Sequence, residues 1–186
     1  MMSNFNTGVD FVIWNEATEK HWFSDDKDDP GGVTAWGITA RYLTDSNLWK
    51  YDRNGDGVID ARDMLKFTRQ DAVDVLKLWW DKYNFKRLNS NDLAKRVFDF
   101  CINSGQSRGI KTLQEAVNSE DFGKMLVVDG VMGKETISLV NSLSNYRLSK
   151  LINIFKKKRV EFYEELAKNR PASRKYLGGW ILRAKK

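Results

Sequence analysis

Apolar side chains recur at helical spacing along most of this chain, and this periodicity limits the folds open to it more than any other feature. The longest such run covers residues 146–167, and shorter runs cover residues 10–22 and 39–49. Strict alternation of apolar and polar residues, which is typical of a half-buried strand, is nearly absent. Thr68 and Ser90 are side chains of the kind that cap helices, and each begins a further helical run. The sequence therefore predicts a mainly α protein with little sheet.

The composition is that of a globular chain that folds without covalent staples. Of the 186 residues 41% are apolar and 30% are charged, which excludes the disordered and low-complexity classes. The single cysteine cannot form an intrachain disulfide, and the single histidine, His21, cannot build a histidine-rich zinc site. These counts exclude zinc peptidases and zinc amidases, and a Ser-His-Asp triad would have to use His21.

Charge is divided unevenly between the two halves of the chain. Residues 1–100 carry 14 basic and 17 acidic side chains, whereas residues 101–186 carry 17 basic and 8 acidic ones. An acidic half joined to a basic half indicates two tasks, and the basic half favours an anionic partner. Nucleic acid, an acidic membrane face and a bacterial envelope polymer all fit, and charge alone does not choose among them.

No segment approaches the 18 or more apolar residues that a membrane span requires. Residues 1–6 contain neither the basic stretch nor the apolar stretch of a signal peptide. We therefore expect a chain that is made in the cytoplasm and does not insert stably into a membrane. If it acts outside the cell, another agent must release it.

The sharpest local motif is the segment Asp-Arg-Asn-Gly-Asp-Gly-Val-Ile-Asp-Ala-Arg-Asp at residues 52–63. It fits the calcium-loop template D-x-N-x-D-G-x-I-D-x-x-D, in which side-chain oxygens and one backbone carbonyl surround a hard cation. Carboxylates this close together repel unless a cation neutralises them. The motif occurs once and ends in Asp instead of the usual Glu, so it favours a structural calcium site over a switch; an Asp-rich surface turn is the alternative. The predicted ligands are Asp52, Asn54, Asp56, Asp60, Asp63 and the carbonyl of Val58.

A second motif combines Val-Ile-Trp-Asn-Glu at residues 12–16 with Asp-Pro-Gly-Gly-Val-Thr-Ala-Trp-Gly-Ile-Thr at residues 29–39. A carboxylic acid at the end of an apolar helix is partly desolvated, which suits a general acid, and Glu16 has that position. A Gly-Gly turn lets backbone approach a bulky substrate, and Thr34 can orient a water. From the residues alone, Glu16 could equally be a charge on a helix surface, and Asp29 could belong to a solvated loop.

These two segments resemble glycoside hydrolase family 108, lysozyme-like N-acetylmuramidases that are often labelled secretion activator proteins and are common in phages and prophages. Residues 98–105, Phe-Asp-Phe-Cys-Ile-Asn-Ser-Gly, are similar to the family's second conserved helix end. Residues 111–116 and 129–136 resemble an appended peptidoglycan-binding region, and Gly-Trp-Ile-Leu-Arg at 179–183 resembles its closing motif. The resemblance spans residues 9–183.

The resemblance implies a lysozyme-like helical catalytic domain at residues 1–104 and a helical peptidoglycan-binding region at residues 105–186. It implies hydrolysis of the β-1,4 bond between N-acetylmuramic acid and N-acetylglucosamine. The family usually has Glu-Gly-Gly-Tyr at its catalytic acid, whereas this chain has Glu-Ala-Thr-Glu at residues 16–19. The preceding apolar residues select Glu16 as the acid, but the distance to the Gly-Gly turn favours Glu19.

Other site residues are predicted less directly. Asp29 is the candidate second carboxylate, because it precedes Thr34 by five residues much as in phage lysozymes. Glycosidases of this kind place two carboxyl groups about 5 Å or about 6.5–9.5 Å apart, and the sequence does not decide between the retaining and inverting outcomes. The predicted substrate-binding residues are Trp36, Asn103 and Gln106, of which the last two end a helix near the expected cleft.

Cys101 and the basic run at residues 156–159 are predicted to have no part in catalysis. Cys101 lies on an apolar helix and is predicted to be a buried thiol rather than a nucleophile. The basic run at residues 156–159 is predicted to be a solvated helix face or, alternatively, an envelope-binding patch.

Two other functions stay open. One is a non-catalytic, calcium-stabilised protein of the same fold that binds the envelope or assists secretion, which the missing Gly-Gly-Tyr supports. The other is a nucleic-acid-binding helical domain, which rests on the basic half alone. The leading hypothesis is a bacterial peptidoglycan hydrolase that acts as a monomer at the cell envelope, holds structural calcium and has no nucleic-acid partner.

Overall fold

The computed structural model describes residues 4–16, 22–25 and 32–186. It divides into two compact units, each described by itself below. The first unit is Val9–Trp79, and the second unit is Met1–Gly8 together with Trp80–Lys186. The predicted division into residues 1–104 and 105–186 stays a prediction.

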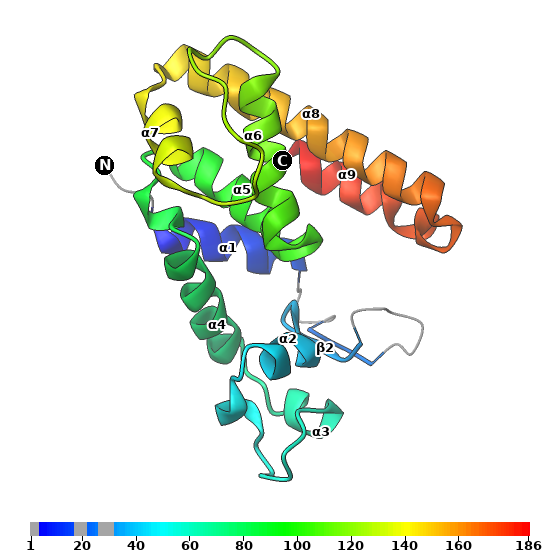
Figure 1. The fold of residues 1–186 in the computed structure, drawn as a ribbon. Helices are drawn as coiled ribbons and strands as arrows, with labels where there is room; N and C mark the ends of the chain where they lie inside the picture. The colour runs from blue at the N-terminus through cyan, green and yellow to red at the C-terminus, as the bar shows by residue number, and fades with distance from the viewer. Residues whose placement is uncertain (1–3, 17–21, 26–31) are drawn as a thin grey trace. The chain divides into compact units, whose positions relative to one another are not determined.

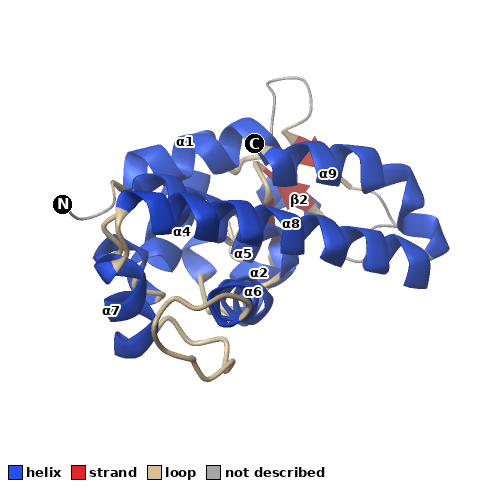
Figure 2. Ribbon diagram, turned by 90° about the horizontal axis from the view of Figure 1, so that it is seen from above, coloured by secondary structure: helices blue, strands red, loops and turns tan. Residues whose placement is uncertain are grey.

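Helices make up most of the described chain (Figures 1 and 2). Each described strand is two residues long. This confirms the prediction of a mainly α fold. None of the described helices combines the length and apolarity that crossing a membrane requires. The α-helices are α1 Phe5–Glu16, α2 Ala40–Asp45, α3 Ala61–Met64, α4 Arg69–Lys82, α5 Asn91–Ser104, α6 Gln106–Asn118, α7 Lys134–Ser142, α8 Asn145–Asn169 and α9 Leu177–Lys185. The 3-10 helices are η1 Trp49–Tyr51, η2 Phe85–Arg87 and η3 Pro171–Tyr176, and the strands are β1 Phe23–Ser24, β2 Thr34–Ala35 and β3 Ile38–Thr39.

Side-chain caps begin several of the predicted helices. Before α4, Asp71 accepts the backbone N–H of Thr68, and the Thr68 hydroxyl accepts the backbone N–H of Asp71. The Ser90 hydroxyl accepts the N–H three residues on, at the start of α5, and Thr39 does the same for α2. Each cap satisfies a backbone donor that has no partner within its helix.

Two helix boundaries differ from the predicted ones, for local reasons. Helix α1 begins at Phe5 instead of residue 10, because Phe5 already has a packing partner in the edge of the Trp80 ring, 5.9 Å away between centroids. Helix α2 ends at Asp45 instead of residue 49. There Asn47 adopts a left-handed φ of 55°, a conformation that asparagine tolerates and that stops a helix.

Helices α5, α6, α8 and α9 pack on one another in the second unit. Gly109 lies inside α6, where a glycine is unfavourable for the helix itself. A Cβ at Gly109 would come within 2.4 Å of the Cys101 sulfur, so this glycine allows α5 and α6 to approach closely. Cys101 is fully buried, and burial raises the pKa of its thiol, which confirms its structural role.

A buried ion-pair cluster joins three of these helices. Asp99 of α5 accepts hydrogen bonds from Arg159 of α8 (2.8 Å) and from Arg183 of α9 (2.7 and 3.0 Å). Asp99 and Arg159 have no exposed surface, and Arg183 is 8% exposed. The prediction that the whole basic run 156–159 faces solvent is therefore wrong for Arg159. Its partner lies 60 residues away in the sequence, where a local charge pattern gives no information.

Replacement of Asp99 by Ala is expected to lower the free energy of unfolding by about 3–5 kcal/mol, because it leaves two buried guanidinium groups without their counter-ion. Urea denaturation at constant pH measures the change. Asp92→Ala is the matched control, because Asp92 also lies on α5 and pairs with two cations, Lys95 and Arg96, but is 45% exposed. Its loss is expected to cost about 1 kcal/mol. Equal losses in the two variants would contradict the role of the buried cluster.

Candidate functional site

The predicted catalytic acid belongs to helix α1. Glu16 is the last described residue of α1, in the first unit. Glu19 and Asp29 fall in segments 17–21 and 26–31, outside the described residues. The choice between Glu16 and Glu19, and the role of Asp29, therefore stay predictions.

A small antiparallel sheet follows α1 and carries Thr34. The strand order is β1-β2-β3, with Ser24 of β1 paired to Thr34 of β2. The Thr34 hydroxyl donates to the carbonyl of Gly32 at 3.0 Å. Its proton is thus engaged, while its oxygen can accept a hydrogen bond from a water.

Trp36 lies in a strained turn between β2 and β3. Trp36 has φ 52° and Gly37 has φ 79°, as in a two-residue type I′ hairpin turn. Asparagine is the usual first residue of such a turn, and a bulky residue there costs roughly 1–2 kcal/mol. Two interactions with Trp22 hold Trp36 in place: the Trp36 N–H donates to the Trp22 carbonyl at 2.6 Å, and the two indoles stack 5.9 Å apart at 25°.

Trp22 and Trp36 are both half-buried, so their stack retains accessible surface. Strained residues persist where the surrounding structure fixes them, and they are frequent at ligand sites. A flat, partly exposed aromatic surface can pack against the apolar face of a sugar ring. Sequence reasoning selected Trp36 but missed Trp22, which only the pairing of β1 with β2 brings beside it.

The structure places Asn103 and Gln106 in the second unit, on either side of Gly105, where α5 gives way to α6 with φ 90°. Asn103 is exposed, and its side-chain oxygen accepts the hydroxyl of Tyr163 at 2.7 Å. The Gln106 amide donates to the carbonyl of Gly130 at 2.8 Å. Both amides thus have structural partners, and their predicted contact with substrate stays a prediction.

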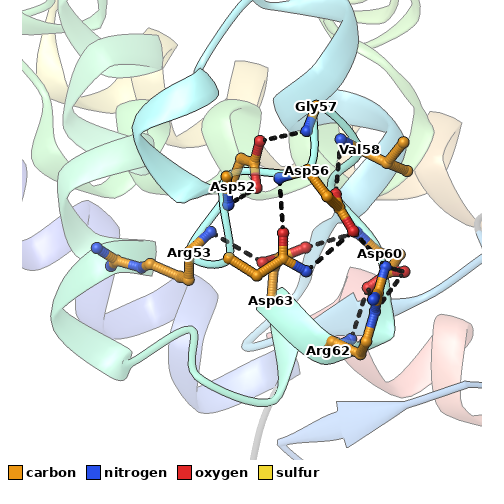
Figure 3. A network of polar contacts seen from close by, with 10 residues as sticks. Asp52, Arg53, Asp56, Gly57, Val58, Asp60, Arg62 and Asp63 are labelled. Atoms are coloured by element: carbon orange, nitrogen blue, oxygen red, sulfur yellow. Dashed lines mark hydrogen bonds and ion pairs between the residues drawn. The ribbon is translucent and has the colours of Figure 1, made fainter.

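The Asp-rich loop at residues 52–63 is ordered by its own backbone (Figure 3). The Asp52 carboxylate accepts the N–H groups of Gly55 and Gly57 at 2.8 and 2.9 Å. Asp56 accepts the N–H of Val58 at 3.0 Å. Gly57 has φ 82°, which permits the sharp turn that the motif requires.

Asp63 and Arg62 complete the loop in a way that the sequence did not reveal. Asp63 is 1% exposed and accepts the N–H groups of Arg53 (2.8 Å) and Asp60 (3.0 Å), so it joins the two ends of the loop. The Arg62 guanidinium pairs with Asp56 and Asp60 and lowers the pKa of Asp60 by its hydrogen bonds (Figure 3). Arg62 therefore supplies positive charge near these carboxylates, whereas the loop motif alone predicts that only a bound metal ion neutralises them.

Among the described residues, no three Asp, Glu, His or Cys side chains converge on one point as a metal cluster would. The loop 52–63 thus has the residues of a calcium site in an arrangement that Arg62 partly neutralises. Calcium binding by this loop stays a prediction.

Comparison with known families decides the class of the protein. The sequence profile described as Glycosyl hydrolase 108 matches residues 9–105, which is more than half of the chain. This chain belongs to glycosyl hydrolase family 108. A second profile, described as Predicted Peptidoglycan domain, matches residues 108–185. The resemblance inferred from the motifs is confirmed, and the chain combines a glycoside hydrolase domain with a peptidoglycan domain.

A solved structure shows the same fold. The structure of Brucella abortus SagA has a TM-score of 0.69 to this family 108 chain, at 24% identity over 97% of this chain and 89% of that one. Identity at this level supports the fold, and the function rests on the family profiles. The comparison with curated proteins gave no match.

Trp36→Asn is expected to leave the chain more stable than Trp36→Val by about 1–2 kcal/mol, although valine is the more apolar replacement. Asparagine tolerates the left-handed backbone of the turn, whereas a β-branched residue there is strongly disfavoured. Thermal and urea denaturation of the two variants measure the difference. A valine variant as stable as the asparagine variant would show that the turn carries no such strain.

Proposed function

We propose that this family 108 chain is an N-acetylmuramidase, which hydrolyses the β-1,4 bond between N-acetylmuramic acid and N-acetylglucosamine in peptidoglycan. One observation carries the proposal. The chain joins a glycosyl hydrolase 108 domain, in which α1 carries Glu16 and a small sheet carries the Trp22–Trp36 stack, to a peptidoglycan domain.

In the proposed mechanism Glu16 is the general acid. It protonates the glycosidic oxygen as the bond from the anomeric carbon to that oxygen breaks, and a water adds to the anomeric carbon. Thr34, whose hydroxyl proton is held by the carbonyl of Gly32, accepts a hydrogen bond from this water, with Asp29 as the candidate base. Glu19 is the alternative acid if the register of the family motif differs by one helical turn.

In this proposal Trp36 contacts the substrate in the first unit, and Asn103 and Gln106 are predicted to contact it in the second unit. The Trp22–Trp36 stack presents a flat apolar surface to a sugar ring. Asn103 is exposed and can hydrogen-bond saccharide hydroxyls. The Gln106 nitrogen is engaged with Gly130, so Gln106 would contribute its side-chain oxygen.

The proposed site of action is the bacterial cell envelope, which the match of residues 108–185 to a peptidoglycan domain supports. The chain would reach the envelope after release from the cell that makes it and would work there as a monomer.

Glu16→Gln is expected to reduce lysis of purified cell walls by about 10²–10⁴-fold, because glutamine keeps the size of the side chain but lacks the proton that the leaving oxygen requires. Glu19→Gln is expected to have a much smaller effect. Loss of turbidity of a wall suspension measures the rate, and equal melting temperatures show that both variants are folded.

The reverse result, an inactive Glu19→Gln and an active Glu16→Gln, would move the catalytic acid to Glu19 within the same mechanism. Full activity of both variants would contradict the mechanism. If the wild-type chain binds walls without releasing soluble fragments, the result would contradict the enzyme activity and favour the non-catalytic, envelope-binding alternative.

We further propose that the loop 52–63 binds one structural calcium. Its support is the motif itself and the backbone hydrogen bonds that hold Asp52 and Asp56 around Gly57. The cation would have to displace the guanidinium of Arg62 from Asp56 and Asp60. Arg62 is therefore a built-in competitor that weakens calcium binding.

Calcium is expected to raise the melting temperature by mass action, since a ligand at a hundredfold excess over its Kd stabilises the folded state by about 2.7 kcal/mol. Asp56→Ala is expected to abolish the increase, and Arg62→Gln is expected to enlarge it by removing the competing charge. Thermal denaturation in chelator and in millimolar calcium measures both effects. Identical melts of the wild type and of Arg62→Gln in the two conditions would exclude the site.

A further inference from the structure

A line of aromatic rings crosses the second unit where α8, η3 and α9 meet. Tyr163 of α8 is 1% exposed and stacks on Trp180 of α9, with ring centroids 5.3 Å apart at 24°. Trp180 is half-buried and lies 5.8 Å from Tyr176, which is 46% exposed. The line thus runs from a buried ring, anchored by its hydroxyl on Asn103, to an exposed one.

Tyr176 and Trp180 are four residues apart, so they lie on the same face of the turn that begins α9. The fold explains Trp180, because its ring covers buried Tyr163. It does not explain Tyr176, which leaves nearly half its surface in water while it rests on Trp180 at 36°. Together the two rings form a partly exposed apolar surface, the aromatic platform.

The backbone beside the aromatic platform is bare. Gly178 and Gly179 are exposed within α9, and a Cβ on either would meet none of the described atoms within 4 Å. A glycine inside a helix costs about 1 kcal/mol relative to alanine. Gly8 and Gly109 have a steric reason for lacking a side chain, since their Cβ atoms would lie 2.4 Å from Trp80 and Cys101; Gly178 and Gly179 have none.

The two glycines differ in their position relative to the aromatic platform. At about 100° per residue, Gly179 lies about 60° around the helix from Tyr176 and about 100° from Trp180, whereas Gly178 lies about 160° from both rings. Gly179 is therefore the nearer of the two glycines to the platform. Substitutions at Gly178 and Gly179 can therefore be compared with each other to separate an effect on binding from an effect on the helix.

The segment that carries the aromatic platform is rich in positive charge. Residues 168–186 contain seven Lys or Arg residues and no Asp or Glu, and Arg183 alone among the seven is buried, on Asp99. Lys175 lies 4.9 Å from the centre of the Tyr176 ring. The six exposed residues are Lys168, Arg170, Arg174, Lys175, Lys185 and Lys186. Such a surface fits a ligand that combines apolar ring faces with carboxylates.

We propose that Tyr176, Trp180 and the bare backbone at Gly179 form a binding subsite for a sugar ring of the peptidoglycan strand, with cations of the same segment holding carboxylates of its peptide side chains. The class of ligand rests on the function proposed above. The subsite binds the substrate and takes no part in cleavage. It lies within residues 108–185, which match a peptidoglycan domain, and would be a point at which this domain attaches to the polymer.

Binding of the full chain to insoluble purified peptidoglycan tests the subsite, measured by co-sedimentation in the cold over a concentration series. Tyr176→Ala is expected to weaken binding about threefold to tenfold, as loss of one aromatic contact does, while Tyr176→Phe retains it. Tyr146→Ala is the matched control, because Tyr146 is 80% exposed on α8 outside the aromatic line, and its loss is expected to leave binding unchanged.

The glycines separate binding from stability. Gly178→Ala and Gly179→Ala are both expected to raise the melting temperature, because each improves helix propensity at an open position. Only Gly179→Ala is expected to weaken binding, since its methyl group would lie beside the platform. Equal binding by all of these variants would overturn the proposal. Binding that falls as salt rises but is unaffected by Tyr176→Ala would also overturn the proposal. It would indicate a purely electrostatic surface for an anionic polymer.

The outcome is separable from that of the proposed enzyme activity. A chain that fails to lyse walls, but whose binding falls in Tyr176→Ala and Gly179→Ala, would support the subsite and contradict the muramidase. A chain that lyses walls, and whose binding is unchanged by both substitutions, would support the muramidase and contradict the subsite.

Discussion

Asp99 receives one arginine from α8 and another from α9, and the arrangement of the second unit depends on this contact. Two cations on one carboxylate leave a net positive charge in the interior, which is costly unless the geometry is good. Two nitrogens of Arg159 have no hydrogen-bond partner among the described residues, but its guanidinium lies 5.0 Å from the centre of the Phe100 ring, which offsets part of this cost. Loss of Asp99 would leave both cations uncompensated.

A second layer of contacts is built directly on this one. Asn103 follows Asp99 by one helical turn, Tyr163 follows Arg159 by one turn, and Trp180 precedes Arg183 by one turn. The ion pairs thereby set the register in which Tyr163 bonds to Asn103 and stacks on Trp180. The buried charges and the aromatic platform are two layers of the same three-helix contact, so the interior contact positions the surface proposed to bind glycan.

Local signals in the sequence predicted several of the helices, because caps and apolar periodicity act over a few residues. The starts of α4 and α5 followed from Thr68 and Ser90, and the mainly α class followed from the missing alternation. Long-range contacts had no such signal. Arg159 was predicted to be part of a solvated basic run because its partner is far along the chain, and the role of Gly109 depends on a neighbouring helix that the local sequence does not indicate.

The candidate site divides in the same way. The sequence placed Glu16 on a helix, and α1 carries it as its last described residue, while its role as the acid stays a prediction. The left-handed backbone of Trp36 could not be predicted, because Trp-Gly is not a usual pair for such a turn and the stabilising partner, Trp22, comes from another strand. In the loop 52–63, the template identified the carboxylates but not Arg62, since the template leaves that position open.

The central claim is that the chain cleaves peptidoglycan hydrolytically after N-acetylmuramic acid. Purified peptidoglycan digested with the wild-type chain, reduced with borohydride and analysed by mass spectrometry tests it most directly. The account predicts soluble fragments that have gained one water per cleavage and carry reduced N-acetylmuramic acid at their new ends. New ends that carry reduced N-acetylglucosamine, or a digest with no new reducing ends, would contradict it.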